Sequence, residues 1–191
     1  MNTEIARIFR AKKDIREFDH LYRKYFPMIN NFVFHRVGNE DVKNEIVSNV
    51  FFKAMKKLYM FRILDVNKVS FSSWLYRISL NEINQYFRNN KRNTKIKTMY
   101  EHNYVKPAND AEKSNLTFEE VRKYMLNLSI DEQNLITLRY FEKQSYQELS
   151  EIFKKTEGAL KVKLHRALNK LRDLLSKEKK DEKPREYLIQ Y

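Results

Sequence analysis

The 191-residue sequence contains no cysteine, two glycines and three prolines. Without cysteine, the chain can form neither a disulfide framework nor a thiolate zinc site, and it has no cysteine nucleophile. Two glycines are too few for a glycine-rich phosphate-binding loop, which needs two or three of them in one short stretch. These absences argue against most classes of cofactor-dependent enzyme.

Long hydrophobic runs are missing as well. The apolar stretches are far shorter than the roughly 20 residues that a membrane-spanning helix needs. The N-terminus also has no uninterrupted apolar segment of the kind found in a signal peptide. We therefore expect a soluble protein of the cytoplasm. A hydrophobic fraction of 42% is enough to bury the core of one domain or of two small ones.

Positive charge is in excess. The chain carries 38 Lys and Arg against 25 Asp and Glu, a net charge of +13. Such a charge favours a polyanionic partner, either nucleic acid or an anionic membrane surface. Because the first 100 residues hold 20 Lys and Arg against 9 Asp and Glu, whereas the rest is nearly balanced, the charge predicts two functionally distinct halves.

The arrangement of apolar residues predicts an all-α fold. In both halves they recur at intervals of three and four, and no useful length alternates with period two. This periodicity is lost in a polar stretch around Pro107, which is typical of a flexible linker. We expect two small helical domains, with boundaries at 1–92 for the N-terminal domain, 93–116 for the linker, 117–176 for a C-terminal helix-turn-helix domain and 177–191 for a charged tail.

Capping residues predict where several helices begin and end. In the N-terminal domain we expect a break between two helices at Pro27, an N-cap at Asp41 for the third helix, and an N-cap at Ser70 or Ser72 for the fourth. The C-terminal domain is expected to hold about four helices separated by loops of only two to four residues, at 117–128, from Ser129 or Asp131 to 141, at 145–153 and at 156–176.

The last two helices form a candidate helix-turn-helix. Ser145 and Glu148 fit a capping box, and Thr156 offers a second N-cap about three residues after the first helix ends. The second helix collects leucines on one face and polar residues on the other. Lys161 and Arg166 there can reach phosphates or guanine edges. Periodicity alone leaves a second interpretation open, in which these residues only solvate a surface helix.

The same segment resembles a known family. The run from Leu138 to Ile152, followed by Thr156-Glu157-Gly158-Ala159-Leu160-Lys161 and Leu164-His165-Arg166-Ala167, is similar to the fourth conserved region of bacterial extracytoplasmic-function (ECF) sigma factors, in the sigma-70 superfamily. In that family the second helix enters the major groove of the minus-thirty-five promoter element. The residues that the resemblance assigns to this contact are Glu157, Gly158, Lys161, Val162, His165 and Arg166.

The resemblance is imperfect in the turn. This sequence has Lys154 and Lys155 where the family usually has a glycine followed by an apolar residue. A residue other than glycine loses about 1 kcal/mol in a left-handed conformation. We therefore expect the turn to be reshaped. Val162, in place of a common small polar residue, is expected to alter the base preference.

The N-terminal half resembles the same family independently. Phe18-x-x-Leu21-Tyr22-x-x-Tyr25 is similar to its first helix, and the string from Phe71 to Ser79, followed by Asn81, resembles its most recognisable motif. The segment from Asp41 to Ala54 looks like the helix that docks on the clamp coiled coil of RNA polymerase. The residues assigned to polymerase binding are Asp41, Glu45, Asn49 and Phe52.

The stretch from Lys56 to Arg92 interleaves aromatic rings with cations. A protein that holds one strand of melted promoter needs stacking faces together with positive charge along the backbone. Trp74, Leu75 and Ile78 are more in keeping with a core than with base platforms. By resemblance, the loop from 62 to 70 receives a flipped base of the minus-ten element. The residues assigned to minus-ten binding and strand opening are Tyr59, Phe61, Arg62, Lys68, Tyr76, Arg77, Asn81 and Arg88.

The resemblance thus implies a sigma factor that directs promoter-specific initiation. Its expected partners are promoter DNA, the beta-prime clamp coiled coil and beta flap of core RNA polymerase, and an anti-sigma factor. We expect no cofactor, no metal and no catalytic activity, because Asp41 and Glu45 fit a docking face better than a Mg²⁺ site. An alternative is an autonomous helix-turn-helix regulator that binds duplex DNA without polymerase and senses a ligand through its N-terminal half.

Overall fold

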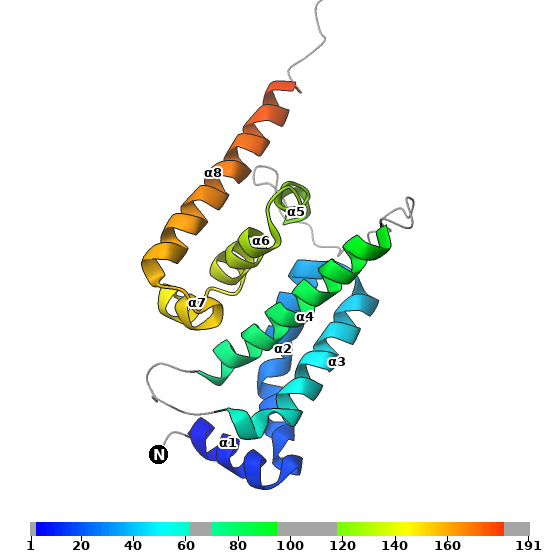
Figure 1. The fold of residues 1–191 in the computed structure, drawn as a ribbon, viewed down its shortest axis with the longest axis vertical. Helices are drawn as coiled ribbons and strands as arrows, with labels where there is room; N and C mark the ends of the chain where they lie inside the picture. The colour runs from blue at the N-terminus through cyan, green and yellow to red at the C-terminus, as the bar shows by residue number, and fades with distance from the viewer. Residues whose placement is uncertain (1–2, 62–69, 95–117, 182–191) are drawn as a thin grey trace, which may run out of the picture.

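The computed structural model describes residues 3–61, 70–94 and 118–181, and all regular elements among them are helical (Figure 1). The all-α prediction is confirmed. None of the described helices is long and apolar enough to cross a membrane. The predicted linker lies outside the described residues apart from its first two, which belong to a helix, and Arg62 and Lys68 also lie outside them.

The N-terminal bundle consists of α1 (Thr3–Lys13), α2 (Phe18–Val37), α3 (Glu40–Lys56) and α4 (Phe71–Thr94), with short 3-10 turns at η1 (Ile15–Glu17) and η2 (Leu58–Met60). The last three helices of this bundle lie side by side, and α1 closes one end (Figure 1). Their shared core is sealed from solvent. Its fully buried residues include Leu21, Ile29, Phe32, Val50, Leu75 and Ile83.

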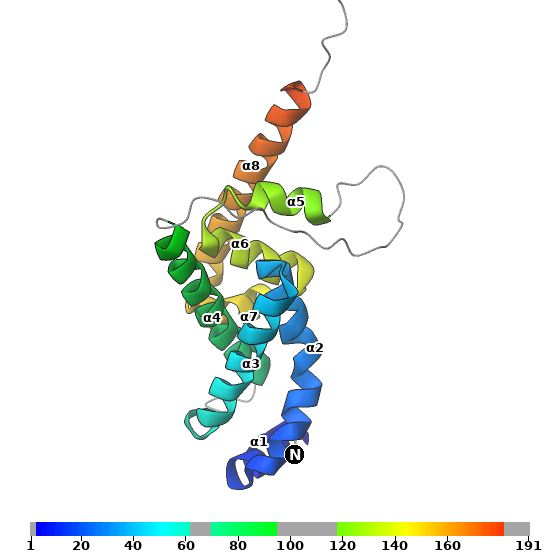
Figure 2. The same cartoon turned by 90° about the vertical axis from the view of Figure 1, so that its right-hand side faces the viewer.

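The C-terminal bundle consists of α5 (Phe118–Met125), α6 (Ile130–Ile136), the π-helical turn η3 (Thr137–Phe141), α7 (Tyr146–Phe153) and α8 (Glu157–Asp181). The helix predicted to run unbroken to 141 is therefore divided into α6 and η3. The buried residues of the C-terminal bundle include Leu135, Leu138, Leu149, Leu160 and Leu164. The last helix extends five residues beyond its predicted end at Ser176 and projects past the bundle (Figure 2).

The predicted helix break at Pro27 is wrong, because Pro27 lies inside α2. A proline inside a helix costs about 3 kcal/mol through the lost hydrogen bond and the clash of its ring. The turns on either side bury Leu21 and Tyr25 before the proline, and Ile29 and Phe32 after it. Since burying each large side chain contributes about 1.5–3 kcal/mol, the packing of both turns outweighs the defect.

Two predicted caps of the N-terminal bundle have different outcomes. Asn39, and not Asp41, is the N-cap of α3, and its side chain accepts a hydrogen bond from Val42 N at 3.0 Å. Asp41 lies in the first turn instead, where its carboxylate favours the positive end of the helix dipole. The prediction of Ser70 is confirmed, since its Oγ accepts from Ser73 N at 3.1 Å at the start of α4.

Candidate nucleic-acid and polymerase interfaces

The helix-turn-helix has the capping interactions that the sequence predicts. Ser145 N donates to Glu148 Oε2 at 2.7 Å, and Glu148 N donates to Ser145 Oγ at 3.2 Å, which completes the capping box of α7. At the start of α8, Ala159 N donates to Thr156 Oγ1 at 3.3 Å. Both helix starts are therefore fixed locally. For the start of α6 the sequence left a choice between Ser129 and Asp131. Ser129 is the N-cap, and it forms a capping box of its own.

The turn between α7 and α8 is not reshaped, which contradicts the expectation from Lys154. This lysine adopts the left-handed conformation itself, with φ 55° and ψ 45°, and its N–H donates to Ser150 O. Ser150 Oγ also donates to Lys155 O at 2.6 Å. These bonds, together with the burial of Leu149 and Ile152, offset the cost of about 1 kcal/mol that a side chain adds in this conformation.

The recognition face of α8 is open to solvent. All six residues assigned to the minus-thirty-five contact are exposed, whereas Leu160, Leu164 and Leu171 of the opposite face are buried. Lys161 Nζ lies 5.1 Å from the centroid of the Tyr146 ring and 3.8 Å from the Glu157 carboxylate. Val162 is 51% exposed and provides the apolar side chain of this face, as contact with a thymine methyl group requires. Basic, polar and apolar groups are thus available on one helix face.

Ion pairs fix α8 against α6. Lys170 Nζ donates to Glu132 Oε1 at 2.6 Å, and Lys163 Nζ donates to Asp131 Oδ2 at 3.0 Å. Burial by itself raises the pKa of Glu132, but hydrogen bonds from Lys170 and Ser129 lower it to about 2. The Glu132 carboxylate is therefore charged throughout the physiological range, and the tie between the two helices persists.

Nothing within this chain requires a glycine at position 158. A Cβ added at this position would meet nothing within 4 Å, and its φ is not in the left-handed region. Glycine inside a helix costs about 0.5–1 kcal/mol relative to alanine. A close approach by a partner from outside is a physical reason for the missing side chain.

We expect Gly158→Ala to raise the melting temperature of the free protein while weakening its binding to duplex promoter DNA. The gain comes from helix propensity, about 0.5–1 kcal/mol, and the loss from a methyl group between α8 and the DNA. Thermal unfolding and fluorescence anisotropy measure the two effects. The neighbouring Ala159→Gly should lower the melting temperature without a comparable loss of affinity. Undiminished DNA binding by Gly158→Ala would contradict the assignment.

The residues assigned to polymerase binding form a stripe on α3. Asp41, Glu45, Asn49 and Phe52 follow one another at intervals of four, four and three, and all four are exposed. The other face of α3 is buried in the bundle. The ring of Phe52 is 52% exposed, with Lys56 Nζ 4.7 Å from its centroid. In the part of the chain that the structure describes, no group of three or more acidic or histidine side chains is placed to hold a metal ion.

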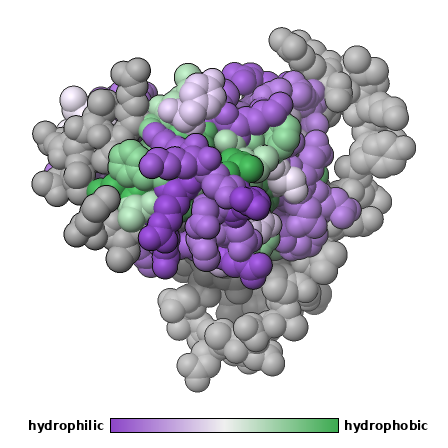
Figure 3. Space-filling model, turned by 90° about the horizontal axis from the view of Figure 1, so that it is seen from below, coloured by the Kyte–Doolittle hydropathy of each residue, from purple (hydrophilic) through white to green (hydrophobic). Residues whose placement is uncertain are grey.

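The surface near α1 mixes polar and apolar groups. Figure 3 views this end and shows a mostly hydrophilic surface with apolar side chains in separate patches. Across the N-terminal bundle the exposed large apolar residues are Phe9, Ile15, Tyr22, Phe52, Tyr59 and Met60. A few apolar anchors within a polar surface are typical of a site that binds another macromolecule.

The residues assigned to strand opening are divided between surface and core. Tyr59 is 75% exposed, Asn81 and Arg88 are exposed, and Arg77 is half-buried. Phe61, by contrast, is 3% exposed, and its ring packs against Phe71 and Trp74, with centroids 5.3 and 5.2 Å away. The structure therefore does not present Phe61 to a base, and its ring supports the core. The predicted core position of Trp74 is in keeping with these contacts.

Tyr76 is fully buried. Its ring meets Phe32 edge-on, with centroids 5.2 Å apart, and its hydroxyl donates to Glu142 Oε2 of the C-terminal bundle at 3.2 Å. Burial, and then the Glu142 carboxylate, raise the pKa of Tyr76, so the hydroxyl remains a donor at neutral pH. Contact of Tyr76 with a base stays a prediction that requires the two bundles to separate.

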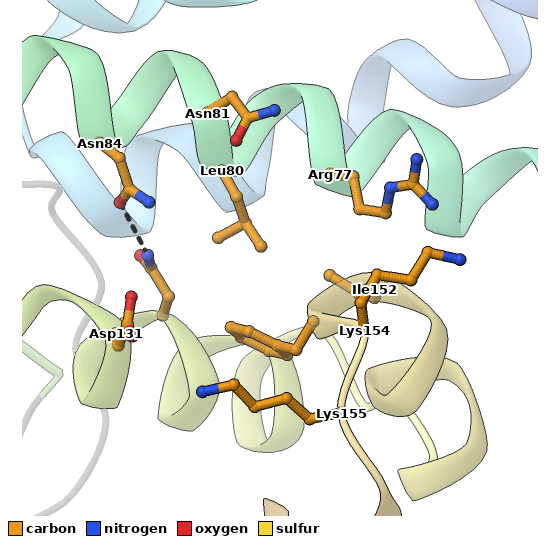
Figure 4. A pocket seen from close by; sticks show the side chains of 10 residues that line it. Arg77, Leu80, Asn81, Asn84, Asp131, Ile152, Lys154 and Lys155 are labelled. Carbon is orange, nitrogen blue, oxygen red and sulfur yellow. Dashed lines mark hydrogen bonds between the residues drawn. The ribbon is translucent and has the colours of Figure 1, made fainter.

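Sequence analysis missed the contact between the bundles. It includes a pocket of about 300 Å³ between α4 and the α6–α7 region (Figure 4). The lining comprises Arg77, Leu80, Asn81 and Asn84 from α4 and Asp131, Asn134, Ile152, Phe153, Lys154 and Lys155 from the other bundle. Polar and apolar residues from distant segments make this contact, and their pairing leaves no periodic signal in a single sequence.

Two helical bundles, one with a helix-turn-helix whose outer face is open, define a DNA-binding protein. Residues 21–93 match the family described as Sigma-70 region 2, and residues 118–171 match the one described as Sigma-70, region 4. The chain belongs to the sigma-70 family of sigma factors, and to its ECF group. It is therefore a non-enzymatic subunit that directs promoter-specific initiation by RNA polymerase, as the sequence predicts.

Several known sigma factors are similar over most of their length. RNA polymerase sigma factor YlaC of Bacillus subtilis is 28% identical over 170 residues, which span 86% of this chain and 95% of YlaC. ECF sigma factor SigW of the same organism is 28% identical over 182 residues, or 88% of this chain and 95% of SigW.

Solved structures share the fold. The sigma factor RpoE of Bartonella quintana, crystallised with the anti-sigma factor NepR, superposes with a TM-score of 0.66 at 23% identity, covering 84% of this chain and 98% of RpoE. CnrH, in complex with the cytosolic domain of CnrY, superposes with a TM-score of 0.64 at 20% identity, covering 90% of this chain and 96% of CnrH.

Proposed function

We propose that the sigma factor uses three separate surfaces during initiation. The stripe on α3 binds the beta-prime clamp coiled coil of core polymerase, and the exposed face of α8 reads the minus-thirty-five element. The third surface comprises η2, α4 and the segment between them, and it holds the opened minus-ten strand. Residues 1–92 and 117–176 act as the two functional domains, the second also contacting the beta flap, with 93–116 as linker and 177–191 as tail.

The observation that carries this proposal is the placement of the first two surfaces. In Figure 1, α3 and α8 lie on opposite sides of the molecule, and the assigned residues of both are exposed. One chain can therefore contact polymerase and duplex DNA at the same time. The net charge of +13 supports association with promoter DNA.

A separate inhibitor is part of the proposal. RpoE of Bartonella quintana was crystallised with an anti-sigma factor. We propose that this chain is likewise controlled by an anti-sigma factor, and that it acts in the cytoplasm. Its sequence has no cysteine, so a zinc site in such a complex would take any thiolate ligands from the inhibitor.

Transcription with purified components tests the proposal. Core polymerase with and without the chain is given a library of genomic promoter fragments, and the 5′ ends of the run-off transcripts are sequenced. We expect new start sites that share one pair of upstream elements at fixed spacing and appear only when the chain is present. Tight operator binding by the chain alone, with unchanged start sites, would contradict the assigned surfaces.

A further inference from the structure

The pocket between α4 and the α6–α7 region has the size of a small-molecule site. Its volume is about 300 Å³, and pockets that bind small molecules typically measure about 300–1,000 Å³. Figure 4 shows the side chains of α4 above the pocket and those of the C-terminal bundle below it. None of the three surfaces assigned to DNA and polymerase explains such a cavity, so its lining indicates what else the chain binds.

Part of the lining is apolar. Leu80 of α4 and Ile152 of α7 line the pocket, and both are buried. Phe153, the last residue of α7, lines it as well and is half-buried. Aliphatic side chains together with an aromatic ring provide a surface on which a planar ring can stack.

The charged part of the lining is mainly cationic. Arg77 from α4 and Lys154 and Lys155 from the turn after α7 contribute to it (Figure 4). Within residues 3–61, 70–94 and 118–181, none of these three side chains forms an ion pair. Asp131 also lines the pocket, but it already accepts from Lys163 Nζ at 3.0 Å. The positive charge is therefore uncompensated, and an anionic ligand would balance it.

Hydrogen bonds hold the turn that carries the two lysines. Ser150 O accepts from the N–H groups of Lys154 and Lys155, and Ser150 Oγ donates to Lys155 O at 2.6 Å. Lys154 has a φ of 55°, a conformation that glycine adopts at lower cost. The backbone thus has no need of a side chain at this position. A long cationic side chain here has a physical reason if it binds an anion in the pocket.

Two asparagines of α4 add hydrogen-bonding groups to the lining. Asn81 is exposed, and Asn84 is half-buried, with its Oδ1 accepting from Asn134 Nδ2 at 3.2 Å. That bond leaves the Nδ2 group of Asn84, with its two N–H donors, for a ligand. Amides can donate to phosphate oxygens and can both donate to and accept from the edge of a base. The pocket therefore combines cationic, polar and apolar groups in one small volume.

We propose that this pocket binds a nucleoside phosphate. The phosphate groups bind to Arg77, Lys154 and Lys155, and the base stacks on Phe153 and the aliphatic side chains beside it. This ligand goes beyond the proposed function, in which every partner is a macromolecule. Its binding requires neither polymerase nor a promoter, so it is measured on the chain alone.

Isothermal titration calorimetry of the full chain tests the chemistry of the ligand. ADP, GDP and UDP carry both a base and phosphate groups, whereas pyrophosphate lacks the base and adenosine lacks the charge. We expect at least one of the three diphosphates to bind about tenfold or more tightly than pyrophosphate and adenosine, since ring stacking and charged hydrogen bonds both contribute. If no diphosphate binds more tightly than pyrophosphate, the pocket does not recognise a base and the proposal is wrong.

Lys154→Gly removes one cation without straining the turn. We expect it to weaken binding of the diphosphate about tenfold, because a hydrogen bond between two charged groups is lost. Lys143→Gly is the matched control, since Lys143 is also exposed and has the same φ of 55°, but it does not line the pocket. Both variants should raise the melting temperature, because glycine relieves the left-handed conformation. An equal loss of affinity in both would indicate a general effect of charge and overturn the proposal.

Two further variants test the other parts of the lining. Arg77→Met retains the aliphatic stem but removes the charge that α4 supplies, and it should weaken diphosphate binding by a similar factor. Phe153→Leu retains an apolar side chain but removes the ring, and it should reduce the preference for the diphosphate over pyrophosphate. Circular dichroism verifies that each variant is helical. Unchanged affinity of Arg77→Met, or an unchanged preference in Phe153→Leu, would contradict the assigned pocket.

DNA phosphates are the competing ligand for the two lysines. Binding of duplex promoter DNA to Lys154→Gly is therefore measured by fluorescence anisotropy, again beside Lys143→Gly. We expect the two variants to lose the same small amount of duplex affinity, since each lacks one positive charge. A larger loss of duplex affinity in Lys154→Gly, with unchanged binding of the diphosphate, would assign this lysine to the DNA backbone and overturn the proposal.

Discussion

Phe52→Ala is expected to lower the affinity of the chain for core RNA polymerase by about 30-fold, because truncating an aromatic hot-spot residue of an interface typically costs about 2 kcal/mol or more. Phe52 is the apolar member of the stripe on α3, and its ring is half-exposed in the free chain. Its neighbours Asp41, Glu45 and Asn49 are polar, so the stripe has one residue able to supply substantial apolar burial. Surface plasmon resonance with immobilised core polymerase measures the change.

The control for this experiment is Leu126→Ala. Leu126 is 56% exposed, close to the exposure of Phe52, but it follows α5 in the C-terminal bundle. Both substitutions remove a similarly exposed apolar side chain, and their effects on the free energy of unfolding should be small. An equal loss of polymerase affinity in both variants would indicate a nonspecific effect. Unchanged affinity for Phe52→Ala would mean that α3 has another role.

Local signals in the sequence predicted the helix-turn-helix well. Ser145 and Glu148 form the predicted capping box, and Thr156 caps α8, because such bonds join residues three apart and need no distant partner. The same locality explains the failures at Pro27 and Lys154. Each of these predictions considered only the local cost of the residue, a few kcal/mol or less. At Pro27 the burial of the neighbouring turns decides the outcome, and at Lys154 the hydrogen bonds of Ser150 contribute to it.

Contacts between distant segments were beyond a single sequence. Arg36 meets Asn134 and Gln133 nearly one hundred residues further along the chain, and neither amide carries a charge that would mark it in the sequence as a partner for Arg36. Phe61 and Tyr76 carry the residue types of base platforms, but the ring of Phe61 packs against Phe71 and that of Tyr76 against Phe32, so both are buried. Aromatic composition predicted a segment for strand opening, but it could not distinguish the rings on the surface from those in the core.

Arg166→Ala is expected to weaken binding of duplex DNA with the minus-thirty-five element by about 10- to 100-fold, the discrimination of roughly 1–3 kcal/mol that one good base contact supplies. Arg166 is exposed on the recognition face of α8, and among the described residues it forms no ion pair that would compete. Removal of one positive charge also weakens any phosphate contact, which lowers affinity for all sequences alike. The experiment must separate these two effects.

Arg172→Ala provides that separation. Arg172 is also exposed on α8 and carries the same charge, but it lies two turns beyond His165, further along the helix than any assigned residue, and donates to Asn169 Oδ1 at 3.2 Å. Both variants are titrated at one fixed salt concentration with duplexes that contain either the intact or a scrambled element. A base contact predicts that Arg166→Ala removes the preference for the intact element, whereas Arg172→Ala retains it. If both variants lose affinity equally for both duplexes, Arg166 acts through phosphate alone, and the base contact must be assigned to another residue of α8.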